Sequence, residues 1–396
     1  MRIGVDAHVL SGNKMGRLGV AMIEPVGGHG GMNYYDFGLC QGLAQFDVDV
    51  ALYTCDKTKV LPALNFEVHT KFKGIYGQDP KWRRAVRFFA GLGKSLVHAR
   101  RNRKSIAHFH IFQITILEWL AVRLFKLAGF RIVITVHDVE SFGYDERVKR
   151  VRSLYTLADR IIAHNQVSKT ELVERLRIEN SAISVIPHGH YVDTIMERLS
   201  KEEARKKLGL NKSDRLLLFF GQIKKVKGLE TLLRALPQVQ KVFPNVKLLI
   251  AGKLWNNDFR MYDSIIEELG IAPLIIRHIR YIPVEAVDSY FSSADLIVLP
   301  YKKIYQSGVL LQSMSYKRPV MVSNIEGMLE IVSDGENGYV FEEGNPESLA
   351  SRIIEALSDD EFRAQTSEVG YHSVVKNHNW RRIGQLTTRL YQDLLH

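Results

Sequence analysis

Short apolar runs alternate with longer amphipathic segments along most of the chain, and this alternation constrains the fold more than any other feature. Strand-length aliphatic runs recur at intervals that leave room for a helix between them. Alternating strands and helices build parallel sheets that are covered by helices on both faces. The strand-like runs are residues 3–5, 48–53, 132–136, 160–163, 183–186, 216–220, 247–251, 295–299 and 320–322, and the main helical patterns are residues 34–45, 118–127, 169–176, 229–240 and 348–357.

The chain has 396 residues, which suits two domains at roughly 100–200 residues per domain. One strand-like run ends at Pro187, a charged helical stretch follows, and a new apolar strand begins at Leu216. This change predicts a linker at residues 190–200. We therefore expect an α/β protein with two doubly wound, Rossmann-like domains facing a central cleft, over residues 1–190 and 197–377. Ligands of such sheets bind beyond the carboxyl ends of the strands.

The composition excludes several classes of protein. Hydrophobic residues make up 46% and charged residues 24% of the chain, which excludes a disordered chain. Cys40 and Cys55 are too few for a disulfide framework or a zinc cluster, and we expect both thiols in the core. No apolar run reaches the roughly 18 residues that a membrane span needs. The first residues lack the apolar centre of a signal peptide, so we expect a cytoplasmic protein.

One segment carries most of the net charge. Nine basic residues and no acidic residue lie between Lys81 and Lys104, in a chain whose net charge is +11. As a helix this segment is amphipathic, with an apolar side of Trp82, Val86, Phe89, Leu96 and Val97 and a basic side of Arg83, Arg84, Arg87 and Lys94. Gly91 and Gly93 weaken the helix propensity of this segment, so two shorter helices are an alternative.

Such a segment suits the surface of an anionic membrane, and we favour that interpretation. The first alternative is a helix that packs on the core and has a solvated basic face. The second is nucleic-acid binding, which is disfavoured because no nucleic-acid-binding motif accompanies the segment.

Three strand ends in the second half share glycines and lysines. Glycines let backbone N–H groups approach an anion, and a helix N-terminus adds partial positive charge. Lysines beside them neutralise phosphate oxygens. The residues concerned are Lys224 and Lys227, Gly252 and Lys253, and Ser307, Gly308 and Val309. Each group alone is typical of an ordinary turn, but together they predict a site for a diphosphate.

Two features of the first half also lie where a strand ends or a helix begins. The glycine-rich residues 27–31 precede a helical pattern and form either a second phosphate-facing loop or a flexible turn. They lack the Gly-Lys-Ser/Thr ending of a P-loop, which argues against a nucleoside triphosphatase. His137 follows the strand-like run 132–136, with Asp138 and Glu140 close behind it. We expect His137 to have a functional role.

Other histidines are less informative. His108 and His110 close the strand-like segment 106–111 and share one side of it. They either contact a substrate or pack in the core. His188 and His190 flank the linker, where either can face the cleft. These histidines have no neighbouring cysteine or histidine ligands, so we expect no metal site.

These features together resemble the GT-B glycosyltransferases, and specifically the retaining enzymes of family 4, over nearly the whole chain. The blocks that carry the resemblance, in the family's order, are residues 30–31, 135–138, 158–163, 185–189, 221–228, 251–253, 293–295, 318–320 and 330–338. Residues 380–394 resemble the family's last helix, which crosses back onto the first domain. We therefore expect the C-terminal helix, about residues 378–396, to pack there.

The resemblance implies a nucleotide-sugar donor held mainly by the second domain. The donor-binding residues that it implies are Gly30, Gly31, Lys224, Lys227, Lys253, Tyr281, Ile282, Ser307, Gly308, Val309 and Gln312. Among them, Tyr281 and Ile282 belong to the loop that contacts the base. His137 matches the histidine that contacts the transferred sugar and is the candidate catalytic residue. The acceptor would enter from the first domain, where His108 and His110 are the candidate contacts.

The sequence departs from the family at one pair of positions. The family usually has two glutamates eight residues apart, and Ile304 and Gln312 occupy those positions here. Gln312 can still form a hydrogen bond to a ribose hydroxyl, but it has no charge. One hypothesis is an acidic donor sugar such as a uronic acid, because a glutamate would repel it. The other is that the chain has lost catalysis.

We therefore expect a retaining glycosyltransferase that moves a sugar to a hydroxyl of a saccharide or lipid-linked acceptor and uses no metal or other cofactor. The basic segment places it peripherally on the inner face of the cell membrane, as in bacterial exopolysaccharide or lipopolysaccharide biosynthesis, with no nucleic-acid partner. Two alternatives remain open. One is a nucleotide-sugar epimerase of the same fold, and the other is a non-catalytic binding or scaffold subunit.

Overall fold

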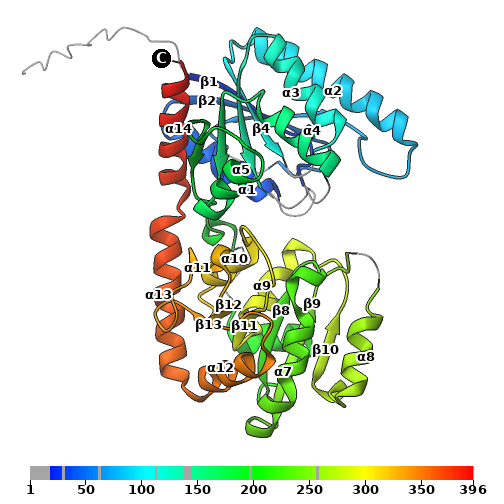
Figure 1. Ribbon diagram of the computed structural model, residues 1–396, viewed down its shortest axis with the longest axis vertical. Helices are drawn as coiled ribbons and strands as arrows, with labels where there is room; N and C mark the ends of the chain where they lie inside the picture. Colours follow the sequence, from blue (N-terminus) through cyan, green and yellow to red (C-terminus); the bar gives the residue numbers. More distant parts are fainter. Residues whose placement is uncertain are drawn as a thin grey trace, which may run out of the picture.

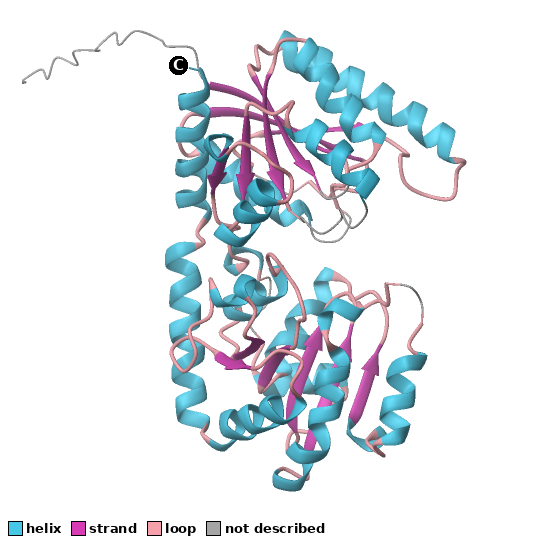
Figure 2. Cartoon of the chain, in the orientation of Figure 1, coloured by secondary structure: helices cyan, strands magenta, loops and turns pink. Residues whose placement is uncertain are grey.

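The computed structural model describes residues 18–28, 32–60, 64–111, 114–137, 145–195, 199–255 and 258–395. These residues form two parallel β-sheets, which lie in separate halves along the long axis of the molecule (Figure 1). Helices cover both faces of each sheet, and the arrowheads of both sheets point toward the junction between the halves (Figure 2). The predicted two-domain α/β fold is confirmed. The strand expected at residues 3–5 lies outside the described residues.

The N-terminal sheet has seven strands in the order β3-β2-β1-β4-β5-β6-β7, and paired neighbours are parallel. The strands are β1 (Leu18–Glu24), β2 (Val48–Cys55), β3 (Glu67–Phe72), β4 (Ile106–Ile111), β5 (Arg131–Val136), β6 (Arg160–Ala163) and β7 (Ile183–Val185). Its helices are α1 (Met32–Ala44), α2 (Lys81–Arg101), α3 (Ile116–Leu127), α4 (Asp145–Tyr155) and α5 (Gln166–Glu174).

The C-terminal sheet has six strands in the order β10-β9-β8-β11-β12-β13. The strands are β8 (Arg215–Phe220), β9 (Val246–Ala251), β10 (Ile275–His278), β11 (Leu296–Leu299), β12 (Val320–Ser323) and β13 (Tyr339–Phe341). The helices that follow the linker are α6 (Lys201–Leu208), α7 (Leu229–Val242), α8 (Arg260–Glu268), α9 (Val284–Ser293), α10 (Gly308–Ser315), α11 (Glu326–Leu329), α12 (Pro346–Ser358), α13 (Asp360–Asn377) and α14 (Trp380–Leu395).

Local sequence signals explain where several of these elements begin and end. Thr115 and Glu118 form a capping box that starts α3, and Ser200 and Glu203 form one that starts α6. Gly209 ends α6 with a φ of 68°, a conformation that glycine adopts without strain. The central strands β4 and β11 are buried at every position, as expected for sheets covered on both sides.

Four strands were not predicted from the sequence: β1, β3, β10 and β13. The first of them, β1, is buried at six of its seven positions and lies between β2 and β4. It begins with Leu18-Gly19, and a glycine near a strand start weakens the sequence signal. The other three lie at sheet edges and have three to six residues. Such short strands are stabilised by pairing with a neighbour, which a local pattern does not contain.

The last helix, α14, returns to the N-terminal sheet and lies against α1, beyond α13 of the C-terminal half (Figure 1). Glycines permit this close contact. A Cβ atom on Gly38 or Gly42 of α1 would overlap Trp380, and one on Gly384 would overlap the backbone of Gly42. The indole N–H of Trp380 donates to the carbonyl of His190 (3.0 Å). This bond fastens the start of α14 to the chain segment between the two sheets.

Candidate active site

Three loops at the carboxyl ends of the C-terminal strands are joined by backbone hydrogen bonds. The N–H of Ile223, after β8, donates to the carbonyl of Lys253, after β9 (2.9 Å). The N–H of Lys302, after β11, donates to the carbonyl of Val226 (2.9 Å). Gly228, at a φ of 63°, packs against the backbone of the loop after β11, where no side chain would fit. The loops that the sequence suggested for a diphosphate therefore lie together.

The two lysines of the first loop each lie over an aromatic ring. Lys224 Nζ is 4.3 Å from the centroid of Trp255, and Lys227 Nζ is 3.9 Å from that of Tyr301. Burial lowers the pKa of Lys227 to about 7. A nearby anion favours the charged form of a lysine, so a bound diphosphate would raise this pKa again. Lys253 is exposed at the edge of the same group of loops.

The N-terminus of α10 adjoins these loops. Ser307 is its N-cap, and its buried hydroxyl oxygen accepts a backbone N–H of the first turn (3.2 Å). Gly308 lies against the Tyr191 hydroxyl, where an added Cβ would be 2.8 Å from the oxygen. Gln312 is half-buried one turn further along, whereas Ile304 packs against the apolar core of the sheet. The first backbone N–H groups of α10 have no carbonyl partner within the helix and can donate to a ligand.

Tyr281 and Ile282 follow β10. The Tyr281 side chain is 58% exposed, while Ile282 is buried and packs in the core of the C-terminal sheet. With its side chain buried, Ile282 could contact a base only through its backbone, and its place in the base site stays a prediction. Arg280 and Pro283, on either side of this pair, are exposed as well.

A group of histidines surrounds Tyr35 at the carboxyl edge of the N-terminal sheet. The ring centroids of His110, His137, His164 and His188 lie 5.1, 4.6, 5.4 and 4.9 Å from that of Tyr35. His164 Nε2 is 3.3 Å from His137 Nδ1. Burial lowers the pKa of all four histidines, to about 4 for His110 and His164. They are therefore neutral at pH 7, and His137 offers a hydrogen bond but no positive charge.

Several predicted residues of the N-terminal half lie outside the described residues. These are Gly30 and Gly31 of the glycine-rich loop, and Asp138 and Glu140 after His137. His188 and His190 are both buried near the start of α14, and the His188 carbonyl accepts a hydrogen bond from the His378 ring (2.8 Å). Sequence reasoning left their orientation open, and they belong to the packing between the sheets and the last helix.

Of the two alternatives for His108 and His110, acceptor contact or core packing, the burial of both side chains favours packing. His108 is fully buried, with Nδ1 at 2.6 Å from the Tyr391 hydroxyl and Nε2 at 2.7 Å from the Thr135 hydroxyl. His110 is also buried, with Nδ1 at 2.7 Å from Asp36 Oδ1. Both project from a central strand that helices cover on both faces, so neither reaches a surface that an acceptor could occupy.

Contacts between the halves involve residues that sequence reasoning missed. The Glu330 carboxylate accepts backbone N–H groups at the start of α5, and Asn165 donates its side-chain amide to the carbonyl of Tyr305. Lys59 and Glu285 form an exposed ion pair (2.9 Å). Asn165 is also the N-cap of α5, which is the local signal that would have singled it out. Glu330 opens a block that the family resemblance already contained.

The basic segment forms one helix, α2, and not the alternative of two shorter helices with a break at Gly91 and Gly93. A different set of residues, Phe88, Leu92, Ser95 and Ala99, faces the core. The predicted apolar side is therefore largely exposed: Trp82 is 65% and Val86 is 61% accessible. Of the predicted basic side, Arg83, Arg87 and Lys94 are exposed and Arg84 is half-buried.

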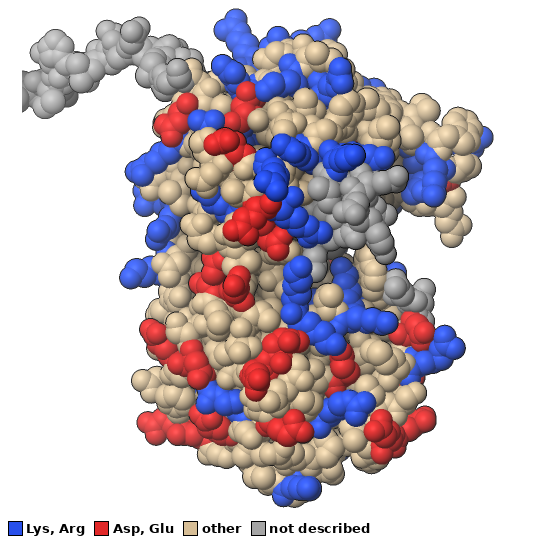
Figure 3. Space-filling view, in the orientation of Figure 1, with Lys and Arg blue, Asp and Glu red and all other residues tan. Residues whose placement is uncertain are grey.

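The neighbouring helix α3 extends this surface with exposed apolar residues at helical spacing, namely Ile116, Leu120, Leu124 and Leu127. Arginines lie over indole rings on both helices, Arg83 over Trp82 (5.2 Å) and Arg123 over Trp119 (5.0 Å). Figure 3 shows Lys and Arg side chains over the N-terminal half, whereas acidic side chains are more frequent over the C-terminal half at the bottom of the view. Among the described residues, no helix has a stretch long and apolar enough to span a bilayer.

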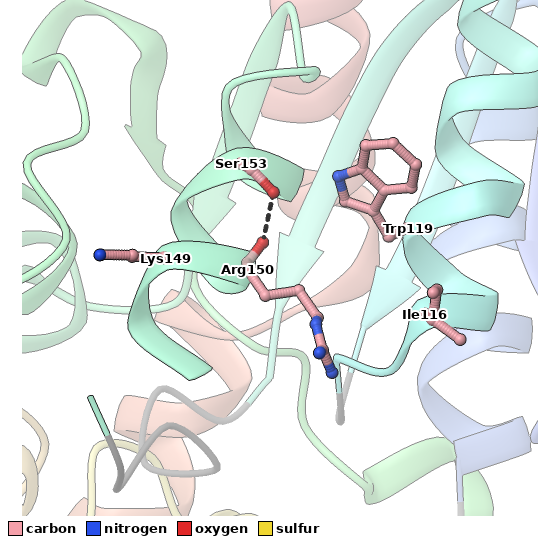
Figure 4. Close-up of a pocket in the computed structure, with 5 residues that line it drawn as sticks. All are labelled: Ile116, Trp119, Lys149, Arg150 and Ser153. Carbon is pink, nitrogen blue, oxygen red and sulfur yellow. Dashed lines mark hydrogen bonds between the residues drawn. The ribbon is translucent and has the colours of Figure 1, made fainter. Parts of the chain in front are cut away.

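A pocket of about 390 Å³ lies between α3 and α4. It is lined by Ile116, Trp119, Lys149, Arg150 and Ser153. In Figure 4 the Trp119 indole faces α4, and the Arg150 side chain extends between the two helices. Arg150 and Lys149 give the pocket a positive charge, and Ile116 joins it to the exposed apolar residues of α3. Sequence reasoning missed this pocket because its residues come from two separate helices.

Two family models match the chain: Glycosyl transferases group 1 over residues 200–373 and Glycosyltransferase Family 4 over residues 29–194. The chain is 22% identical over 391 residues to a D-inositol 3-phosphate glycosyltransferase of Corynebacterium urealyticum, covering 93% of this chain and 92% of that protein. It is 27% identical over 238 residues to an uncharacterized glycosyltransferase of Methanocaldococcus jannaschii, a match that spans only 59% of each chain.

The fold is also similar to a solved structure, Anabaena HepE in complex with UDP-glucose. The TM-score is 0.73 at 16% identity, and the match covers 95% of this chain and 100% of that one. The two family models together include the strands of the C-terminal sheet and all those of the N-terminal sheet after β1. The chain therefore belongs to the group 1, family 4 glycosyltransferases, which have the GT-B fold.

Proposed function

We propose that this glycosyltransferase moves a sugar from a nucleoside diphosphate sugar to a hydroxyl of its acceptor with retention of configuration. The observation that carries the proposal is the joining of Lys224, Lys227 and the N-terminus of α10 in one group of strand-end loops. Two cations and a helix N-terminus suit a diphosphate. The similar fold of HepE, whose structure holds UDP-glucose, supports this donor class.

The chemistry rests on stabilising the leaving group. As the bond between the anomeric carbon and the diphosphate oxygen breaks, negative charge grows on the diphosphate, and Lys224, Lys227 and the N–H groups of Gly308 and Val309 neutralise it. The acceptor hydroxyl attacks the same face of the sugar and gives its proton to the departing phosphate oxygen. Neutral His137 orients the sugar by a hydrogen bond.

The uncharged Gln312 and the apolar Ile304 stand where the family usually has glutamates. A glutamate beside the sugar would repel a carboxylate on the donor, and Gln312 would not. We therefore propose an acidic donor sugar, such as a uronic acid. This part of the proposal concerns donor choice and does not affect the diphosphate site.

The acceptor is proposed to be lipid-linked at an anionic membrane surface, as in exopolysaccharide or lipopolysaccharide assembly on the inner face of the cell membrane. The exposed apolar and basic residues of α2 and α3 support this placement. The pocket between α3 and α4 replaces His108 and His110 as the acceptor site. Its positive side chains suit a phosphate-linked headgroup, and its apolar edge suits the lipid chain.

The donor site is tested by thermal shift of the purified protein with UDP, GDP, ADP, CMP and dTDP. A nucleotide present at about 100 times its dissociation constant should stabilise the fold by roughly 2.7 kcal/mol. Lys224→Gln should abolish this stabilisation, whereas Lys225→Gln, on an exposed residue of the same loop, should retain it. No stabilisation by any nucleotide would contradict the proposal.

One other function is a non-catalytic binding subunit of the same fold. The apolar Ile304, at a position where the family usually has a glutamate, favours it. That function predicts nucleotide binding without sugar transfer when a crude lipid acceptor is added. A nucleotide-sugar epimerase predicts conversion of the donor without any acceptor. Transfer of a labelled sugar that depends on acceptor lipid would argue against both.

A further inference from the structure

Three ionisable residues meet in the interior of the N-terminal domain. Glu24 ends β1, Asp36 lies in α1 and His110 lies in β4, and their exposed fractions are 0, 1 and 5%. Atoms able to bind a metal, one from each residue, lie within 4.8 Å of one another. His110 Nδ1 is 2.7 Å from Asp36 Oδ1 and 3.8 Å from Glu24 Oε2.

This cluster has more hydrogen-bonding atoms than partners. Glu24 Oε1 accepts the N–H of Val26 (2.7 Å), but Oε2 has no hydrogen-bond partner among the described residues. Asp36 Oδ2 and His110 Nε2 also have no partner there. Buried polar atoms without partners are strongly unfavourable and therefore rare, so three in one cluster call for an explanation.

The cluster also combines two buried carboxyl groups with one imidazole. Among the described residues, His110 is a basic side chain within 4 Å of both carboxyl groups. Burial raises the pKa of Glu24 and of Asp36, so each carboxyl group favours its protonated form when no ion is present. A divalent cation between the three side chains would displace these protons and use the unpartnered carboxylate oxygens.

We propose that Glu24, Asp36 and His110 bind one divalent first-row transition-metal ion. Two carboxylate oxygens and one imidazole nitrogen suit Mn²⁺, Fe²⁺, Co²⁺ or Zn²⁺, whereas Mg²⁺ and Ca²⁺ prefer oxygen ligands alone. The three ligands project from three packed elements, two strands and a helix, which hold them in place without a bound ion. This proposal differs from the expectation of no metal site, which was based on histidines that are scattered along the sequence.

The ion would join β1, α1 and β4 at the carboxyl edge of the N-terminal sheet. Because Glu24 also accepts the N–H of Val26, the ion would hold the start of the glycine-rich loop at residues 27–31. The proposed diphosphate site lies on the other domain. The proposed metal site can therefore be tested independently of the proposed function.

The test measures metal binding to the full chain after dialysis against a chelator. Mn²⁺, Co²⁺ and Zn²⁺ are each added, bound metal is counted by mass spectrometry after equilibrium dialysis, and the melting temperature is recorded. His69→Gln is the matched control, because His69 is half-buried, lies 2.9 Å from Glu67 and is close to His98, so that an ion could also attach there. Circular dichroism reports whether each variant is folded.

The wild type and His69→Gln should each bind one ion per chain and melt at a higher temperature with it. Asp36→Asn should bind the ion more weakly by at least the roughly 10- to 100-fold that loss of an outer-shell partner produces. If Asp36→Asn does not fold, Glu24→Gln takes its place. If neither variant folds, the test is the visible absorption of Co²⁺ added to His69→Gln, which must show a band from Co²⁺ bound to an imidazole. The proposal is overturned if the wild type binds none of the three ions, if the folded variants bind them as tightly as the wild type does, or if that band is absent.

Discussion

Glu330 of the C-terminal half accepts the backbone N–H of Val167 at the start of α5, with 2.8 Å between Glu330 Oε1 and the Val167 nitrogen. Its second oxygen accepts the N–H of Gln166 (3.0 Å). A carboxylate from one domain thus occupies the N-terminus of a helix in the other, where N–H groups lack partners within the helix. This contact and the Asn165–Tyr305 hydrogen bond hold the two halves against each other.

Glu330→Ala should loosen this contact without unfolding either sheet. A carboxylate at an exposed helix N-terminus stabilises by about 0.3–1 kcal/mol. Amide hydrogen exchange at the start of α5 should therefore become up to about fivefold faster, which mass spectrometry of peptides can measure. Glu336→Ala, on an exposed residue of the same region, serves as the control. Unchanged exchange at Gln166 and Val167 would contradict the role given to Glu330.

Lys227 should make donor binding depend on pH. Burial lowers its pKa to about 7, so without ligand it loses its charge as the pH rises through 7, and an anionic diphosphate must restore the proton. The affinity for UDP-glucose, whose diphosphate does not titrate in this range, should be about 15-fold weaker at pH 8.5 than at pH 7. Calorimetry in buffers of different ionisation enthalpy should detect proton uptake. Lys227→Gln should bind weakly at both pH values, and a pH dependence that survives this substitution would exclude Lys227.

Gly38→Ala should destabilise the junction between α1 and α14. The added Cβ would overlap the indole of Trp380, and overpacking of a core typically costs about 1–3 kcal/mol. Gly93→Ala is a control of opposite sign, since nothing lies within 4 Å of its Cβ position and it sits inside α2. It should stabilise the helix by up to about 1 kcal/mol. Melting temperatures should fall for the first variant and remain level or rise for the second.

Membrane binding should depend on the exposed charges of α2. Each basic side chain near an anionic surface contributes about 1 kcal/mol, so Arg83→Gln with Lys94→Gln should weaken binding about 30-fold. Flotation with vesicles of phosphatidylglycerol and phosphatidylcholine measures this loss. The matched control changes Lys206 and Lys241, which are exposed on the C-terminal half. Equal loss in both double variants would point to unspecific charge attraction and not to α2.

Gln312→Glu should change the choice of donor. The new carboxylate would repel an acidic sugar, so transfer from a nucleoside diphosphate uronic acid should fall while transfer from the neutral sugar rises or stays level. The measurement is the ratio of kcat/KM for UDP-glucuronic acid and UDP-glucose. A large gain with the acidic donor would contradict the hypothesis drawn from this position.

The chain's own pattern was sufficient for the architecture and for part of the site. Alternating apolar runs predict two parallel sheets, because burial on both faces requires continuous aliphatic strands. Loops at Lys224, Lys253 and Ser307 were predicted to meet because the carboxyl ends of parallel strands share one edge. Their joining by backbone hydrogen bonds agrees with that expectation. These features are local or follow from topology.

Tertiary structure decided which polar residues are accessible. His108 and His110 follow the pattern of residues at a strand end, but β4 is central and covered, so both are buried. The apolar stripe of α2 was expected to lie opposite the basic side, and packing of Phe88 and Leu92 left that stripe in solvent. Glu24, Asp36 and His110 are separated in sequence and meet only through packing of β1, α1 and β4. Burial and proximity depend on which elements become neighbours, and that information is not contained in any single segment.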